Sequence, residues 1–144
     1  MKVGHVHLKI RDLQRSVDFY RHYLGLEVTE QLGTDLVFMS AGAMHHELAL
    51  QQVGKQAHLP SRYNVGLYHV AFEVPDRDAL AETYRKLQRG GLRVSLVDHR
   101  ISWALYFSDP DGNGIEVYWD TRQTGHGTET WEGIDRPLNT SQLN

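Results

Sequence analysis

The 144-residue chain contains no cysteine. It can therefore form neither a disulfide nor a thiolate metal site, and any metal must bind through histidine and carboxylate side chains. Proline is scarce, at 4 residues, while 13 glycines and 40% hydrophobic residues fall in the ordinary globular range. These values exclude disordered and collagen-like chains, and the length is that of one domain.

Neither sign of charge dominates, since 15 Lys and Arg stand against 18 Asp and Glu. The basic residues are scattered, so the footprint of a nucleic-acid binder is missing and nucleic acid is not an expected partner. No hydrophobic run approaches the ~20 residues of a membrane span, and the N-terminal segment is too short and too polar for a secretory signal. We expect a cytoplasmic protein with no membrane partner.

One segment of the chain occurs twice. Residues 4–12, GHVHLKIRD, match residues 68–76, YHVAFEVPD, in the His-Val pair and in the closing Asp. At the same offset, each copy contains a Tyr-Arg pair. With the offset increased by two residues, Leu26 of the first copy matches Leu92 of the second. Two copies of one structural module follow.

Each copy begins with an alternating strand pattern, followed by an Asp suited to N-capping and an amphipathic helix. In the first helix an apolar face precedes Gly25, which stands where a C-terminal capping glycine belongs. Three short strand patterns then follow in each copy, at residues 26–32, 36–40 and 46–51 and at residues 92–97, 103–107 and 115–119. The sequence predicts an α+β fold of two tandem βαβββ modules that form a cupped mixed sheet around a metal site.

The expected layout is one domain over residues 1–144. The first module covers residues 1–53, a linker residues 54–66, the second module residues 67–120, and a polar C-terminal arm residues 121–144. In this arm Trp131 and Leu138 are the expected anchors. Within the second module the run DPDGNG, at residues 109–114, predicts a tight hairpin turn.

Strand alternation places ligand-type side chains on the faces away from the helices. His5 and His69 occupy equivalent positions in the two copies, and Glu116 lies opposite the apolar Ile115 and Val117 on the last strand. A single strand histidine is more often a surface residue, but its repetition in both modules favours a ligand. Two histidines and one carboxylate suit non-heme Fe(II) and leave coordination positions open.

Four segments carry a resemblance to a known family: GHVHLKIRDLQRSVDFYRHYLGLEV, MHHELALQQ, LYHVAFEVPD and DHRISWALYFSDPDGNGIEVYWD. They resemble the vicinal oxygen chelate superfamily, which includes glyoxalases, bleomycin resistance proteins and extradiol dioxygenases, and most of all the catechol 2,3-dioxygenase-type ring-cleavage enzymes. The resemblance implies a homodimer that cleaves an aromatic substrate with O₂. It implies Fe(II), or less often Mn(II), held by His5, His69 and Glu116.

The resemblance also implies roles for three further side chains. His46 matches the acid-base histidine of the ring-cleavage enzymes, Tyr106 the tyrosine that hydrogen-bonds the substrate oxygen, and His99 a further substrate-side histidine. Alternatively, His46 is a solvated residue at the end of a strand, and Tyr106 only packs against its neighbours. Two departures bear on the substrate, because the large catechol dioxygenases carry an extra pair of modules and their loop histidine is offset by two positions from His99.

Other activities of the same fold compete with this interpretation. A glyoxalase I-like isomerase, a lactoylglutathione lyase, would bind Ni(II) or Zn(II) with Glu47 as fourth ligand. On a regular strand His46 and Glu47 face opposite ways, and we predict that His46 faces the metal. A fosfomycin-resistance-like transferase would use Mn(II) but would need a cationic cluster that is not evident. A metal-free aromatic-binding or drug-binding protein would not need the intact ligand set.

Overall fold

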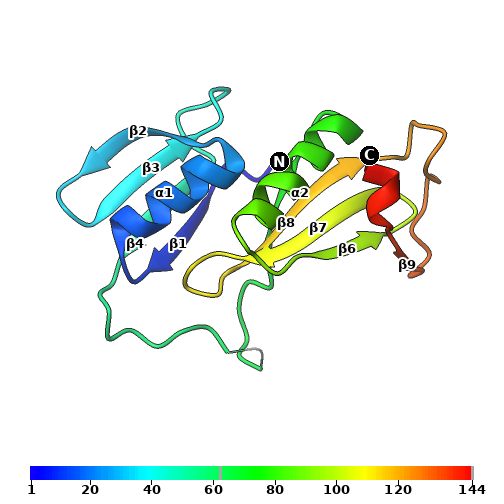
Figure 1. The fold of residues 1–144 in the computed structure, drawn as a ribbon. Coiled ribbons are helices and arrows are strands. Elements are labelled where there is room, and N and C mark those ends of the chain that lie inside the picture. Colours follow the sequence, from blue (N-terminus) through cyan, green and yellow to red (C-terminus); the bar gives the residue numbers. More distant parts are fainter. Residues whose placement is uncertain (62, 144) are drawn as a thin grey trace. The chain divides into compact units, whose positions relative to one another are not determined.

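The structure is a computed structural model that describes residues 1–61 and 63–143. Residue 62 of the expected linker and residue 144 of the expected arm lie outside the described residues. The chain forms two compact units, of which the first comprises residues 1–66 and 109–113 and the second residues 67–108 and 114–144. In the described residues each unit carries one α-helix and one mixed sheet, and the second unit adds a 3-10 helix near the C-terminus. The elements can be followed in Figure 1. The predicted α+β fold of paired βαβββ modules is confirmed.

The first unit contains a four-stranded sheet in the order β1-β4-β3-β2. Its elements are β1 (Val6–Ile10), α1 (Leu13–Leu24), β2 (Glu27–Leu32), β3 (Leu36–Ser40) and β4 (Leu48–Gln52). Strands β1 and β4 are parallel, while β4, β3 and β2 are antiparallel neighbours. The helix therefore carries the chain from β1 to β2 at the opposite edge of the sheet, and β3 and β4 then lead it back beside β1.

The second unit repeats this order as β5-β8-β7-β6, with β9 added at the edge. Its elements are β5 (Val70–Glu73), α2 (Arg77–Arg89), β6 (Ser95–Asp98), β7 (Ser102–Ser108), β8 (Gly114–Asp120), β9 (Arg136–Pro137) and the 3-10 helix η1 (Thr140–Leu143). Strands β5 and β8 are again parallel. The same pairing in both units shows that the internal repeat of the sequence is a repeat of topology.

The two helices begin with the same side-chain cap. Asp12 accepts a hydrogen bond from the backbone N–H of Arg15 at 3.0 Å, and Asp76 accepts one from that of Ala79 at 2.8 Å. At the other end of α1, Gly25 adopts φ +68°, the left-handed conformation predicted for it. In the described part of the chain, no helix is long and apolar enough to cross a membrane.

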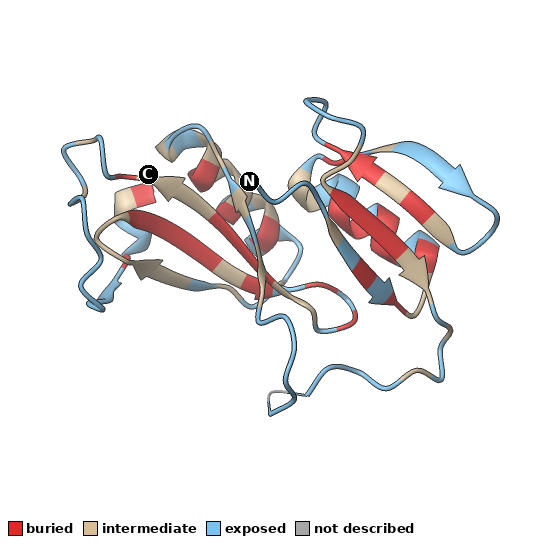
Figure 2. Ribbon diagram, turned by 180° about the vertical axis from the view of Figure 1, so that it is seen from behind, coloured by how far each residue is buried: buried red, intermediate tan, exposed pale blue. Residues whose placement is uncertain are grey.

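The core of each unit lies between its helix and one face of its sheet (Figure 2). Buried side chains alternate with exposed ones along β1, where Leu8 and Ile10 are buried while His7 and Lys9 are exposed. The helix-side faces of the sheets carry the core residues Val37, Met39, Leu48, Leu50, Leu105, Phe107, Ile115 and Val117. The opposite face of each sheet, which we call its free face, is where the predicted ligand residues were expected.

The hairpin turn between β7 and β8 forms at residues 109–113, as the DPDGNG run predicts. Asp109 is 5% exposed and accepts hydrogen bonds from the backbone N–H groups of Asp111 and Asn113 and from the Tyr20 hydroxyl. Asp111 accepts one from the Arg11 backbone at 2.8 Å. These carboxylates are buried because hydrogen bonds satisfy them, and their role is structural.

Two strands begin later than the sequence pattern indicates. The strand predicted over residues 46–51 starts at Leu48, because residues 45 and 47 are bends and the Glu47 N–H donates to the Met39 carbonyl at 3.1 Å. The strand predicted over residues 92–97 starts at Ser95, because the Leu92 N–H still donates to the Leu87 carbonyl at the end of α2. In both cases a hydrogen bond to another backbone carbonyl replaces the regular pairing between strands at the first predicted residues.

The C-terminal arm folds back onto the second unit. Its strand β9 pairs with β6 through Val97 and Asp98. Leu138 is 5% exposed, which confirms it as an anchor. Trp131 is 46% exposed and anchors the arm by other contacts, because its ring lies 5.7 Å from that of His99 and its indole N–H donates to Asp135.

Candidate metal and substrate site

The free face of the second sheet brings Glu116 close to His69. Glu116 is 8% exposed, and its Oε2 lies 2.9 Å from Nε2 of His69. Two atoms that bind one metal ion at ~2.1 Å and at right angles to each other are ~3.0 Å apart. The imidazole and the carboxylate are within hydrogen-bond distance of each other, a spacing that two ligands of one ion can also have, and their donor types fit a divalent transition metal.

His69 precedes β5 and lies beside Gly114, the first residue of β8. A Cβ atom at Gly114 would lie 2.3 Å from the Tyr68 carbonyl oxygen and 3.2 Å from Cβ of His69. Only glycine permits this approach, so Gly114 is what allows the histidine to reach Glu116. The other ring nitrogen of His69, Nδ1, is buried and has no hydrogen-bond partner among the described residues.

Tyr106 lies on β7 directly beside Glu116 in the strand register. Its hydroxyl oxygen lies 2.8 Å from Nε2 of His99, and its ring packs edge-on against the ring of His69. Burial, followed by the charge of Glu116 and a hydrogen bond to it, raises the pKa of Tyr106 well above its ordinary value. The phenol therefore remains protonated at neutral pH and can donate a hydrogen bond.

The arm supplies a partner for His99 that sequence reasoning missed. Oδ1 of Asp135 lies 2.5 Å from Nδ1 of His99 and accepts the indole N–H of Trp131 at 2.9 Å. The hydrogen bond with His99, more than that with Trp131, lowers the pKa of Asp135. A carboxylate at Nδ1 fixes the tautomer in which Nε2 is free to accept the Tyr106 proton. No sequence signal marks this contact, because Asp135 is one of several acidic residues in a polar arm.

The loop that carries His99 is held from both sides. Arg100 adopts φ +67°, a conformation that non-glycine residues rarely take. Its backbone N–H donates to Asp98 at 2.7 Å, its carbonyl accepts from the Thr128 N–H at 2.7 Å, and its guanidinium pairs with Glu132. The arm therefore fixes the conformation of the whole loop as well as the imidazole.

In the first unit the structure brings His5 and His46 together. Their ring centroids are 4.6 Å apart, and the His46 ring also lies 4.7 Å from that of Phe38. The Glu47 carboxylate accepts a hydrogen bond from the Ala41 backbone N–H at 3.1 Å. Strand alternation cannot distinguish His46 from Glu47, because both residues precede β4, but only the His46 ring packs against His5.

The surroundings of His46 favour its neutral form. Burial, followed by repulsion from His5 and His45, lowers the pKa of His46. A neutral imidazole at pH 7 can accept a proton, which is what an acid-base residue needs. His45 is more exposed, and its Nε2 lies 3.2 Å from the Glu30 carboxylate, so this neighbour is the solvated residue of the pair.

The predicted metal ligands are distributed over both units, with His5 in the first and His69 and Glu116 in the second. Among residues 1–61 and 63–143, no group of three or more His, Asp or Glu side chains is gathered to hold a metal ion. The complete ligand set therefore remains a prediction. What the structure describes is a contact between His69 and Glu116 in the second unit and one between His5 and His46 in the first.

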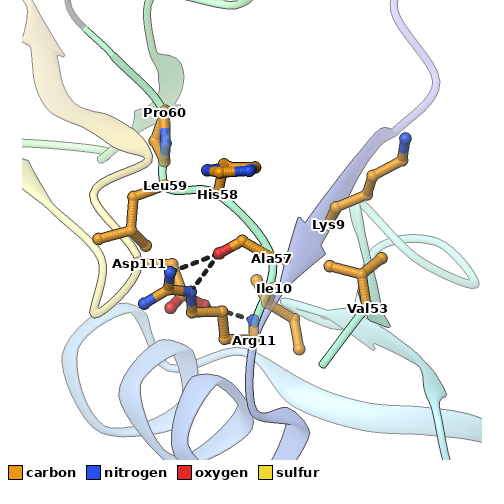
Figure 3. Close-up of a pocket in the computed structure, with 9 residues that line it drawn as sticks. All are labelled: Lys9, Ile10, Arg11, Val53, Ala57, His58, Leu59, Pro60 and Asp111. Atoms are coloured by element: carbon orange, nitrogen blue, oxygen red, sulfur yellow. Dashed lines mark hydrogen bonds between the residues drawn. The ribbon is translucent and has the colours of Figure 1, made fainter. Parts of the chain in front are cut away.

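The first unit also contains a cavity of about 310 Å³ (Figure 3). It is lined by Lys9, Ile10, Arg11, Val53, Ala57, His58, Leu59, Pro60 and Asp111. The Arg11 guanidinium donates to the Ala57 carbonyl, and its backbone N–H donates to Asp111. These bonds tie the linker to the unit and engage the arginine, so we regard this cavity as structural.

Comparison with known proteins places this geometry in a family. Residues 2–117 match the family described as the Glyoxalase/Bleomycin resistance protein/Dioxygenase superfamily. The chain belongs to this superfamily. The resemblance found in the four sequence segments is thereby confirmed, and the fold of two βαβββ units agrees with it.

The relatives include dioxygenases and a lyase. The chain is 36% identical over 130 residues to a catechol-2,3-dioxygenase of Bacillus subtilis (strain 168), covering 90% of this chain and 44% of that protein. It is 31% identical over 126 residues to biphenyl-2,3-diol 1,2-dioxygenase 3 of Rhodococcus globerulus, covering 85% of this chain and 65% of that protein. It thus spans less than two thirds of both relatives.

Among solved structures, the lactoylglutathione lyase from Agrobacterium tumefaciens matches with a TM-score of 0.63 and 25% identity. The match covers 82% of this chain and 92% of that one. Named relatives of this chain therefore include both dioxygenases and a lyase.

Proposed function

We propose that the protein is an extradiol dioxygenase that uses Fe(II) and O₂ to cleave a catecholic aromatic ring. The observation that carries this proposal is the connected series of side chains in the second unit, from His69 and Glu116 through Tyr106 and His99 to Asp135. It places a ligand pair beside a protonated phenol and a histidine of fixed tautomer. Dioxygenases at 36% and 31% identity support the same chemistry.

His5, His69 and Glu116 would hold the metal ion, with Mn(II) as the alternative to Fe(II). Bound there, the ion would supply Lewis acidity and one-electron chemistry and would bring the diol and O₂ together. The remaining steps belong to side chains of this chain. We expect a homodimer as the functional assembly, with the aromatic substrate and O₂ as the only other partners.

The side chains around the ligand pair each have a defined task. His46, neutral at pH 7, accepts a proton from a substrate hydroxyl and returns it later in the reaction. The Tyr106 hydroxyl lies 2.8 Å from Nε2 of His99 and has one proton to donate. When substrate binds, the hydroxyl would turn this hydrogen bond from His99 to the ring oxygen. Asp135 is a positioning residue, because it acts on the substrate only through His99.

The overall reaction balances without a further reductant. The carbon-carbon bond next to the diol breaks, both atoms of O₂ enter the product, and the product is a ring-opened semialdehyde acid. The aromatic ring is oxidised, and O₂ is reduced by the same electrons. No external electron donor is needed.

The second candidate is a lactoylglutathione lyase-type isomerase, favoured by the structural match to such a lyase. That activity would need Glu47 as a fourth ligand to Ni(II) or Zn(II). The Glu47 carboxylate instead accepts the Ala41 N–H, so it would have to exchange this hydrogen bond for a metal bond.

An assay over two substrate classes tests the proposal. Protein purified without oxygen and loaded with Fe(II) should consume O₂ with a panel of substituted catechols and form coloured ring-cleavage products. The same protein loaded with Ni(II) or Zn(II) should leave methylglyoxal and glutathione unchanged. Turnover of methylglyoxal with no oxygen uptake on any catechol would reverse the assignment in favour of the isomerase.

A further inference from the structure

The middle of the C-terminal arm, between β8 and β9 in Figure 1, runs along the surface between two fixed ends. Before it, Thr121 is fully buried, and Gly127 packs so closely on it that a Cβ atom there would lie 2.4 Å from the Thr121 carbonyl oxygen. After it, Leu138 is 5% exposed. Every residue from 128 to 137 is exposed, and only the last two of these form a strand. We call residues 128–135 the strap.

The polar contacts between the strap and the rest of the unit converge on the loop that carries His99. The Thr128 backbone N–H donates to the Arg100 carbonyl at 2.7 Å. Among the described residues, every hydrogen bond and ion pair from the strap to the rest of the chain involves His99 or Arg100. The strap residues that contact these two are Thr128, Trp131, Glu132 and Asp135.

The backbone is strained on both sides of this junction. Arg100, at φ +67°, and Glu132, at φ +56°, are the two non-glycine residues with positive φ in the part of the chain that the structure describes. They also form an ion pair with each other. A residue with a side chain keeps this conformation only where its surroundings enforce it. Separation of the strap from the loop would let both residues relax, so the strain favours opening.

The contacts that oppose opening are exposed ones. The side chains of Glu132 and Asp135 are 57% and 53% exposed, and ion pairs in contact with water contribute little net stability. The strap also has no buried apolar side chain. A segment of this kind opens locally at a much lower free energy than the unfolding of the whole unit. The strap should therefore leave the loop while Thr121 and Leu138 stay in the core.

Opening of the strap changes what His99 can do. With Asp135 in place, the proton of the neutral imidazole stays on Nδ1, and Nε2 can accept a hydrogen bond from Tyr106 or from a substrate hydroxyl. Without Asp135, the two ring nitrogens share the proton and the ring loses its orientation. A ligand that donates to Nε2 therefore binds the closed form better, so ligand binding and closure stabilise each other.

We propose that residues 128–135 open and close on the His99 loop, and that a substrate hydroxyl bound beside Tyr106 and His99 closes them. The inference rests on the proposed function for the identity of the substrate, a catechol. The opening itself follows from the strap and its loop alone. Through Asp135, closure would fix the orientation of His99 at the moment when the substrate is present.

Hydrogen exchange of two backbone amides tests the strap in the Fe(II)-loaded protein without oxygen, with single amides resolved by fragmentation in the mass spectrometer. The Thr128 N–H reports on the strap, and the Thr121 N–H, which donates to the Ile101 carbonyl at 2.9 Å, reports on the fixed part of the same arm. After correction for intrinsic rates, Thr128 should exchange about 10-fold faster than Thr121 or more. A saturating catechol should slow Thr128 by about 10-fold, within the usual range of coupling between two sites, and leave Thr121 unchanged.

Glu132→Gln weakens the junction and should speed the exchange of Thr128 without affecting Thr121. Glu129→Gln is the matched control and should behave as the wild type. Glu129 is an exposed acidic residue of the strap that makes no hydrogen bond or ion pair with any residue that the structure describes. Thermal unfolding of each variant verifies that it folds.

Equal exchange of the two amides in the free protein, or equal exchange of Thr128 in the two variants, would overturn the inference. Oxygen uptake separates it from the proposed function. No slowing of Thr128 by a catechol that the protein oxidises would reject the strap alone. Slowing by a catechol without O₂ consumption would keep the strap and reject the dioxygenase, and the absence of both effects on every catechol would reject both.

Discussion

The two units share a topology but differ in how their functional side chains are held. In the second unit, Glu116 lies 2.9 Å from His69, Tyr106 lies 2.8 Å from His99, and Tyr106 and Glu116 are partners in the strand register. The arm closes this series at Asp135. In the first unit, His5 contacts His46 through a ring contact at 4.6 Å, and the rest of its free face is exposed or apolar.

This difference shows that a repeated backbone does not distribute chemistry equally. The repeat provides equivalent positions for His5 and His69, but the residues that fix orientation come from outside the repeat. They are supplied by the C-terminal arm, which has no counterpart after the first module. The second unit should therefore determine substrate orientation, and the first should contribute one ligand and one acid-base group.

The largest effect is expected at the preformed ligand pair. Glu116→Ala removes the carboxylate that lies 2.9 Å from His69, so the bound metal should fall from one ion per chain to the background level and activity should disappear with it. Elemental analysis of protein purified without oxygen measures this. Glu47→Ala is the control and should keep its metal. Metal retained in Glu116→Ala, or lost in Glu47→Ala, would move the site to other residues.

His46→Ala probes the first unit. Because His46 acts as a base rather than a ligand in this account, kcat should fall by ~10²–10⁴-fold while the metal content stays the same. The control His22→Ala alters an exposed histidine of α1 in the same unit and should change kcat little. Equal losses in the two variants, or no loss in His46→Ala, would contradict the role of His46 as the base.

Asp135→Asn tests the contribution of the arm. Replacing the carboxylate removes the group that fixes the His99 tautomer, so kcat should fall by about 10- to 100-fold with little change in KM or metal content. The pH dependence of kcat should also change shape, which a purely structural role would not cause. Glu132→Gln alters another acidic residue of the arm, where the partner is Arg100, and should keep the wild-type pH profile.

The smallest effect is expected at the helix caps, where the two units are alike. Asp12→Ala and Asp76→Ala should each lower the free energy of unfolding by about 1 kcal/mol, because each removes one side-chain acceptor from a helix N-terminus. Urea titration monitored by circular dichroism measures both. A much larger loss in one variant would mean that the symmetry of the repeat does not extend to stability.

The fold and the ligand types could be predicted from the sequence because local rules govern them. Alternation placed His69 and Glu116 on one face, and the capping glycine and aspartates marked the helix ends. The contact between Asp135 and His99 could not be predicted, because it joins residues far apart in the sequence and depends on where the arm turns back.

The role of His46 was only partly accessible from the sequence. A regular strand would send His46 and Glu47 to opposite faces, but the chain bends before β4, and alternation does not hold there. The His46 ring packs against His5 because a side chain in a bend is oriented by its contacts. A sequence pattern cannot indicate such a bend when the residues on both sides have strand-like composition.

Incorporation of labelled oxygen tests the central claim most directly. The Fe(II)-loaded protein is given a catechol that it consumes, under dioxygen labelled with the heavy isotope, and the product is analysed by mass spectrometry. The account predicts that both oxygen atoms of one labelled O₂ molecule appear in a single ring-opened product, with one O₂ consumed per substrate. An intact quinone, or a product that contains no label, would contradict extradiol cleavage.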